Sequence, residues 1–322
     1  MSYALLMKLG RPPLFDYLER SARVLLAGAG GGYDIFCGLP LYFALEAEGK
    51  QVFLANLSFS NLGGVSARRL APAVATVNRL SEGSERYFPE RHLAAWFETE
   101  GRDVSIYCFE KTGVVPLTEA YRAVIDEHSI DALVLIDGGT DSLMRGDEAG
   151  LGTPAEDMAS IAAATNIDLD TKALVCLGFG VDTYHGVSHA QVLEATAELQ
   201  RDGGFLGAFS LLPEMPEVKQ YIDAVSYVRR LSPKRPSIVN ASILSALEGA
   251  FGDVHSTDRT RGSELFINPL MSQYFAYRLD PLANRVRYLE KLRYTQTIAE
   301  VVAIIEAYRK NETIRNWRTI PL

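Results

Sequence analysis

The sequence predicts an α/β protein in which helices cover both faces of a mostly parallel, doubly wound sheet of the Rossmann-like kind. Short runs rich in Val, Leu, Ile and Ala recur along the first half of the chain, without the polar alternation of a half-exposed strand. Segments with helical spacing of apolar residues separate these runs. Strands that are buried on both faces and joined by helices form parallel sheets.

The first half of the chain supplies the predicted core. Strands are expected at 24–27, 51–56, 104–109, 132–136 and 173–177, and helices at 14–20, 34–48, 118–126 and 188–200. Segment 65–80 also has helical spacing in part. Thr153, Pro154 and Glu156 together indicate a helix start, with a threonine cap, proline in the first turn and glutamate three residues after the cap.

The second half is less regular. We expect a sixth strand at 204–212, helices at 217–231 and 236–251, a strand within 265–279 and a closing amphipathic helix at 298–308. No internal repeat or obvious linker interrupts the chain. We therefore expect one domain over 1–322, with a core at about 12–212 and a helical C-terminal elaboration at about 213–322.

Composition excludes several classes of protein. The 322 residues are 48% hydrophobic and 22% charged, which is typical of a folded globular protein. The net charge of −8 provides no basic field for a polyphosphate, so nucleic acid and anionic membrane are not expected partners. No apolar run approaches the roughly 20 residues of a membrane span, and Cys37, Cys108 and Cys176 match no disulfide or metal spacing. We expect a soluble, cytoplasmic protein.

A glycine-rich loop follows the first predicted strand and precedes a helix. Gly28, Gly30, Gly31 and Gly32 allow the backbone to approach a ligand closely, and the helix N-terminus favours an anionic group. Asp34, in the first helical turn, would cap the helix or reach a ligand hydroxyl or a metal. The alternative is a turn that serves only strand–helix packing.

The same region disfavours the common cofactors of this fold. The dinucleotide fingerprint requires glycine where Tyr33 stands, and Asn56 ends the second strand in place of a ribose-binding acid. NAD, FAD and S-adenosylmethionine are therefore not expected. Asn56 remains a candidate ligand-binding residue.

The stretch after the fourth strand is rich in acids. Asp137, Asp141, Asp147 and Glu148 lie within a dozen residues, and Gly139 and Thr140 are candidate ligand-binding residues among them. Carboxylates that share a pocket require a cation, a proton or a positively charged substrate. Oxygen ligands suit Mg²⁺ or Mn²⁺, so these four acids are the predicted metal ligands. The alternative is a solvated loop that caps the next helix.

The loop after the fifth strand holds Asp182, His185 and His189. Asp182 and His185 suit an acid–base pair in which histidine moves the proton and aspartate orients the ring. Together with Asp141 they form the predicted catalytic set, whereas His189 is as well explained by a structural role. A strand order near 3-2-1-4-5 would bring this loop and the two preceding ones to one crevice between strands one and four.

Two segments carry a resemblance to a known family. The first is the loop 28–34 together with the following Phe36-Cys37-Gly38-Leu39-Pro40. The second is the segment 137–154, which contains the motifs AspGlyGlyThrAspSerLeu, GlyAspGlu and GlyThrPro. Both are similar to a family of conserved archaeal and bacterial proteins of unknown function. The resemblance covers roughly residues 12–310 and implies a Rossmann-like fold. It implies no particular activity.

The leading hypothesis is an enzyme that carries out metal-assisted hydrolysis or group transfer on a small phosphorylated or nucleotide-like substrate. A metal-free acid–base enzyme acting on a sugar, nucleoside or amino acid is the alternative, as is a sensor without turnover. The expected partner is thus a small polar or anionic ligand. The tail 311–322, with Trp317, would dock on its own domain or support a homo-oligomer, and 252–263 is expected to be a mobile loop near the site.

Overall fold

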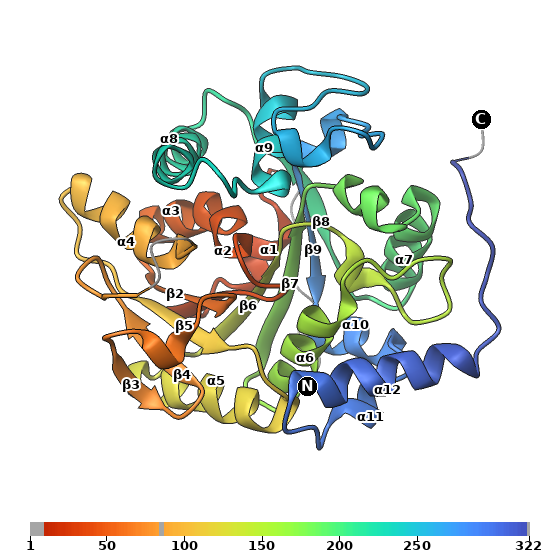
Figure 1. The fold of residues 1–322 in the computed structure, drawn as a ribbon, viewed down its shortest axis with the longest axis horizontal. Helices are drawn as coiled ribbons and strands as arrows, with labels where there is room; N and C mark the ends of the chain where they lie inside the picture. Colours follow the sequence, from red (N-terminus) through yellow and green to blue (C-terminus); the bar gives the residue numbers. More distant parts are fainter. Residues whose placement is uncertain (1–9, 84–86, 321–322) are drawn as a thin grey trace.

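The computed structural model describes residues 10–83 and 87–320, and within them the chain forms one nine-stranded sheet in the order β3-β4-β5-β2-β1-β6-β7-β9-β8 (Figure 1). The centre of the sheet is parallel. Its strands are β5 (Ile106–Glu110), β2 (Gln51–Ser58), β1 (Arg23–Gly28), β6 (Ala132–Asp137) and β7 (Thr171–Leu177). The predicted doubly wound α/β fold and its 3-2-1-4-5 core order are confirmed.

Antiparallel pairs extend both edges of this parallel centre. One edge carries the hairpin of β3 (Arg68–Ala71) and β4 (Val74–Val77), and the other carries β9 (Gln273–Arg278) and β8 (Phe205–Ser210). The helical prediction for segment 65–80 is therefore wrong. Val74, Ala75 and Val77 of β4 are buried against β5, and the β-branched valines suit a strand better than a helix.

Helices cover both faces of the sheet. Helices α3, α4 and α8 lie on one face, and α5, α6 and α12 on the other (Figure 1). Two separate apolar cores result, one beneath each helical layer. The helices are α1 (Pro13–Tyr17), α2 (Asp34–Cys37), α3 (Leu39–Ala47), α4 (Pro89–Thr99), α5 (Val114–His128), α6 (Pro154–Thr165), α7 (His189–Arg201), α8 (Pro216–Leu231), α9 (Ile238–Leu247), α10 (Leu279–Arg285), α11 (Leu289–Leu292) and α12 (Ile298–Lys310).

Several helix boundaries differ from the predictions. The expected helix 34–48 breaks at Gly38 into α2 and α3, because Pro40, in the first turn of α3, has no amide hydrogen to continue the preceding helix. Helix α5 begins at Val114 rather than at 118, so Thr118 is a buried interior residue whose hydroxyl donates to the Val114 carbonyl. Helix α4 was not predicted.

The topology places three loops together. The chain leaves β1 toward the α3 face and leaves β6 toward the α6 face, so the switch point lies between these neighbouring strands. The loops after β1, β6 and β7 meet at this carboxyl edge, where doubly wound sheets bind ligands. Among the described residues, no helix is both long and apolar enough to cross a membrane.

Candidate functional site

Three aspartates from separate elements converge at the switch point. Asp34 begins α2, Asp137 ends β6 and Asp157 lies in the first turn of α6. One carboxylate oxygen from each can be chosen so that all three atoms lie within 4.8 Å of one another. Asp34 and Asp137 are site residues that the sequence predicts, whereas Asp157 is not, because its segment indicates only a helix start.

Two further aspartates adjoin this group. Asp141 begins the short 3-10 helix η2 (Asp141–Leu143), and Asp182 lies in η3 (Val181–His185). The Thr140 amide donates to Oδ2 of Asp182 at 2.6 Å, and the Thr153 amide donates to Oδ2 of Asp141 at 2.8 Å. We refer to Asp34, Asp137, Asp141, Asp157 and Asp182 as the carboxylate cluster.

Most of the cluster is shielded from water. The exposed fractions of Asp137, Asp141, Asp157 and Asp182 are 3%, 4%, 2% and 7%. Within the described residues, Oδ1 of Asp157 is buried and has no hydrogen-bond partner. A buried carboxylate oxygen without a donor is costly, so this atom indicates that a proton, a cation or a ligand belongs there.

Burial and mutual repulsion shift the titration of the cluster. Burial, followed by the charge of Asp141, raises the pKa of Asp137 from 3.8 to about 7. Burial and the neighbouring aspartates raise the pKa of Asp34, Asp157 and Asp182 well above its ordinary value. Without a cation, the cluster therefore retains protons near neutral pH. A bound cation would favour the ionised forms and release those protons.

Glycines allow the carboxylates to approach the backbone. A Cβ at Gly30 would lie 2.7 Å from Oδ1 of Asp157 and 2.9 Å from Oδ2 of Asp34. A Cβ at Gly139 would collide with Asp182, and one at Gly152 with Asp141. The glycines therefore serve the acids of the cluster, rather than making room for a ligand as the sequence analysis expected.

The amides of the glycine loop are already used by the protein. The Gly30 amide donates to Oδ2 of Asp34 at 2.8 Å, and the Gly32 amide donates to the Leu57 carbonyl at 3.1 Å. Gly28 packs against the side chain of Asn56. The expectation that this loop holds the anion of a ligand is corrected accordingly, because the anion held by Gly30 is the protein's own Asp34.

Asn56 also has an internal role. Its Nδ2 donates to the Gly32 carbonyl at 2.9 Å and to Oε1 of Glu90 at 2.8 Å. Glu90 is fully buried in α4, and burial raises its pKa from 4.5 to about 7. Asn56 thus holds the glycine turn against α4. Glu90 was not among the predicted site residues because α4 was not predicted.

The predicted metal ligands Asp147 and Glu148 are engaged elsewhere. Oxygens of Asp147 contact the guanidinium groups of Arg145, Arg287 and Arg315 at 2.7–3.0 Å. Burial opposes the ionisation of Asp147, but these arginines prevail and lower its pKa below 3.8. Glu148 accepts the amides of Arg145 and Gly146. The four-acid metal set is therefore not formed, because arginines distant in sequence neutralise two of its members.

His185 lies near the cluster without joining it. The side chain is exposed, its ring packs on Tyr184, and its charge acts on Asp141. The carboxylate of Asp182 accepts from Thr140, and in the described structure His185 makes no hydrogen bond to it. The expected Asp182–His185 pair is thus not made directly. His189 is half-buried between aromatic rings, consistent with the structural alternative.

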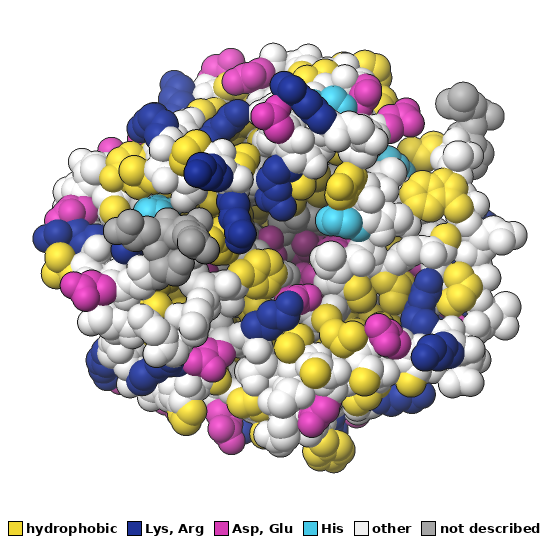
Figure 2. All heavy atoms as spheres, in the orientation of Figure 1, with side chains coloured by type: hydrophobic (Ala, Val, Ile, Leu, Met, Phe, Trp, Pro, Cys, Tyr) yellow, Lys and Arg dark blue, Asp and Glu magenta, His cyan; other side chains and the backbone are white. Residues whose placement is uncertain are grey.

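The surface is hollowed at this edge of the sheet. Figure 2 shows a hollow near the centre of the face, with Asp or Glu side chains in its floor, a histidine at its edge and Lys or Arg side chains around it. In Figure 1 the same place lies where the loops after β6 and β7 approach α6 and α9. Acids in the floor and basic residues on the rim suit a ligand that carries both a cation and an anionic group.

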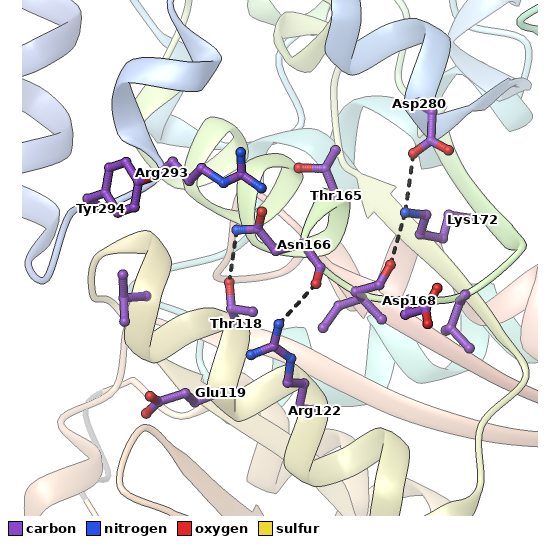
Figure 3. A pocket seen from close by; sticks show the side chains of 13 residues that line it. Thr118, Glu119, Arg122, Thr165, Asn166, Asp168, Lys172, Asp280, Arg293 and Tyr294 are labelled. Carbon is purple, nitrogen blue, oxygen red and sulfur yellow. Dashed lines mark hydrogen bonds and ion pairs between the residues drawn. The ribbon is translucent and has the colours of Figure 1, made fainter.

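Another cavity, of about 630 Å³, opens at the amino ends of the strands, where β7 begins (Figure 3). Lys172 at the start of β7 pairs with Asp280 at 3.2 Å and donates to the Ile167 carbonyl at 3.0 Å. Arg122 donates to the Asn166 carbonyl at 3.1 Å. The cavity lies at the amino ends of the strands, away from the switch point where doubly wound sheets bind ligands, so it is a weaker candidate for the functional site than the carboxylate cluster.

The fold and the site define an α/β protein with a doubly wound sheet and a buried carboxylate cluster at its switch point. The chain belongs to the family described as "Protein of unknown function (DUF1152)", whose model matches residues 25–312. The matched range contains the whole carboxylate cluster. The family membership confirms the resemblance to an uncharacterised family. Comparisons with curated proteins and with solved structures gave no match.

The raised pKa of Asp137 predicts how stability changes with pH in the metal-free protein. The unfolded chain loses this proton above about pH 4, whereas the folded protein keeps it up to about pH 7. The free energy of unfolding should therefore fall as pH rises from 5 to 8, by about 1–3 kcal/mol relative to Asp137→Asn. Urea unfolding with a chelator measures this difference. A wild type that gained stability relative to the variant over this range would contradict the assignment.

Asp147 is predicted to stabilise the fold and the C-terminal tail. Asp147→Ala leaves three guanidinium groups without their shared partner, so we expect a loss of about 2 kcal/mol or more in the free energy of unfolding. Trypsin should also cleave faster after Arg315, whose amide donates to the Asp147 carbonyl. Asp258→Ala removes only an exposed pair and should change stability by less than about 1 kcal/mol. Equal effects of the two variants would refute this role.

Proposed function

We propose that the protein is an enzyme that binds a divalent cation at Asp34, Asp137 and Asp157 and uses it for hydrolysis or group transfer on a small phosphorylated or nucleotide-like substrate. The observation that supports this most directly is the convergence of three carboxylate oxygens within 4.8 Å. The unpartnered, buried Oδ1 of Asp157 is a second, independent observation. Bringing these acids together without a cation is unfavourable unless they take up protons.

The donor atoms favour a hard cation. Carboxylate oxygens suit Mg²⁺ and Mn²⁺. Two thiols lie near the cluster, since Sγ of Cys176 is 3.6 Å from Oδ2 of Asp137 and Cys37 lies beside Gly138. Among the described residues, the possible metal ligands that lie within 4.8 Å of one another include neither thiol, so the donors at this place are carboxylate oxygens. Mg²⁺ or Mn²⁺ is therefore the cation we assign.

The neighbouring acids provide proton transfer. A bound divalent cation would polarise a phosphoryl oxygen and lower the pKa of a water molecule. Asp141 and Asp182 have raised pKa values because burial disfavours their ionised forms, so each holds a proton to higher pH than an exposed aspartate does. His185, exposed near Asp141, is the proposed third member of this set. These residues form the proposed catalytic set.

The anionic part of the substrate binds to the cation and the basic rim. The glycine-loop amides are used internally by Asp34 and Leu57, so they contribute by fixing the cluster. Lys and Arg side chains surround the acidic floor of the hollow (Figure 2). A phosphate in this position would contact the cation below it and a positively charged side chain above it.

A metal-free acid–base enzyme acting on a sugar, nucleoside or amino acid is the second candidate. The raised pKa values favour it, because protonated aspartates donate hydrogen bonds to hydroxyl groups without any metal. A chelator distinguishes the two candidates. Activity on phosphorylated compounds that stops with a chelator and returns with Mg²⁺ supports the first, and activity that persists supports the second.

Calorimetric titration tests the cation site directly. Chelator-treated wild type should bind Mg²⁺ and Mn²⁺, and Asp157→Asn should bind at least about tenfold more weakly because one charged ligand is lost. Asp280→Asn, at the amino ends of the strands, should bind as the wild type does. Metal should also raise the melting temperature of the wild type but not that of Asp157→Asn. Absence of binding heat and of thermal shift in the wild type would refute the proposal.

Gly30→Ala is predicted to weaken cation binding without unfolding the protein. The added Cβ would lie 2.7 Å from Oδ1 of Asp157, so the two side chains must separate and the ligand geometry is lost. Gly64→Ala is the matched control, because its nearest neighbour is 4.0 Å away. The far-ultraviolet circular dichroism of both variants should match that of the wild type. Unchanged Mg²⁺ affinity in Gly30→Ala would contradict the close packing of this site.

A further inference from the structure

Aromatic rings cover the outer surface of the glycine turn. A Cβ at Gly31 would lie 2.7 Å from the Phe59 ring, and a Cβ at Gly32 would lie 2.8 Å from the Tyr87 hydroxyl and 3.3 Å from Phe59. Both glycines have positive φ, +92° and +64°, so a side chain would be strained as well as crowded. The Tyr33 and Tyr87 rings are in edge contact, with centroids 5.7 Å apart. We refer to Phe59, Tyr87 and Tyr33 as the aromatic wall.

The aromatic wall borders the carboxylate cluster. Gly30 touches Asp157 from within the cluster, and the next residue, Gly31, touches Phe59 from the wall. Because consecutive Cα atoms are about 3.8 Å apart, the Asp157 carboxylate and the edge of the Phe59 ring lie at most about 12 Å from each other. A span of this size can hold both the base and the phosphate of one nucleotide.

Positive charges accompany the wall. Nζ of Lys111 lies 5.4 Å from the centroid of the Phe59 ring and also pairs with Glu156, the neighbour of Asp157 in α6. Lys111 thus reaches from the end of β5 to the start of α6, between the wall and the cluster. On the other side, burial raises the pKa of Tyr33 and Tyr87, and the charge of Arg259 opposes this rise in both residues. Arg259 therefore lies near both phenols.

Phe59 itself is unusually open for a residue that makes these contacts. Its exposed fraction is 49%, although its ring edge is fixed by the glycine turn. A single exposed phenylalanine is ordinary. An exposed ring that is fixed beside a lysine and at most about 12 Å from a cation site has the arrangement that stacks a planar base while the phosphate is bound nearby.

We propose that the substrate of this site is a nucleoside phosphate bound with the divalent cation, with its base stacked on the aromatic wall at Phe59 and its phosphate between the cation and Lys111. This inference rests on the proposed function and adds the class of substrate. A sugar phosphate would use the cation and Lys111 but leave the wall uncovered. The wall therefore determines specificity for the base.

Matched ligands test the role of the wall. The four common ribonucleoside 5′-monophosphates and ribose 5-phosphate share the sugar and phosphate and differ in the presence of the base. Calorimetry with and without Mg²⁺ should show tighter binding of at least one nucleotide than of ribose 5-phosphate, by about tenfold. Phe59→Ala should remove that preference and leave the affinity for ribose 5-phosphate unchanged, whereas Phe59→Tyr should retain the preference. Lys111→Gln should weaken both kinds of ligand.

Phe251→Ala is the control, because Phe251 is an exposed phenylalanine whose ring contact is with Phe266 rather than with the wall. It should bind every ligand as the wild type does. Equal affinity for nucleotides and ribose 5-phosphate, or an equal loss for both in Phe59→Ala, would overturn the inference. If Mg²⁺ binds while no nucleotide is preferred, the cation site stands and the substrate assignment falls. If no Mg²⁺ binds, the proposed function fails whichever nucleotide is preferred.

Discussion

Repulsion among carboxylates in a water-excluded space is the constraint on which the rest of the site depends. The five aspartates of the cluster come from five different secondary-structure elements and meet at the carboxyl ends of the strands. At low dielectric this repulsion is far stronger than it is in water. The fold offsets it in part through backbone amides, which donate from Gly30 to Asp34, from Thr140 to Asp182 and from Thr153 to Asp141. These amides provide partial charge without adding a cationic side chain that would compete for the site.

The contrast with Asp147 shows what a structural carboxylate looks like in this chain. Asp147 is as buried as the cluster, yet three arginines contact it and lower its pKa. Arginine side chains thus neutralise the buried acid Asp147, and these arginines lie outside the carboxylate cluster. Asp157 instead retains an oxygen without a partner. This distribution of charge favours a cation-binding role for the cluster over a purely structural one.

The sequence predicted the architecture better than it predicted the site. Apolar runs and helical spacing were sufficient for the central five strands and their order, because buried parallel strands have a strong local signal. Asp137 and Asp182 were identifiable from their place after a strand. Asp157 and Glu90 lie within helices, where an acid in the first turn is ordinarily explained by the helix dipole. Asp147 and Glu148 were misassigned because Arg287 and Arg315, which pair with them, lie about 140 to 170 residues further along the chain.

The glycine loop illustrates why a motif and its role must be separated. A glycine-rich turn between a strand and a helix usually exposes its amides to a phosphate. Here the same backbone geometry is used twice within the protein, since Gly30 accommodates two carboxylates on its inner side, and Gly31 and Gly32 accommodate aromatic rings on its outer side. The turn therefore sets the distance between the acids and the aromatic wall. Because that distance is fixed by adjacent backbone residues rather than by flexible side chains, a ligand that contacts both must match it in length, and this rigidity is the physical basis for selecting one class of substrate.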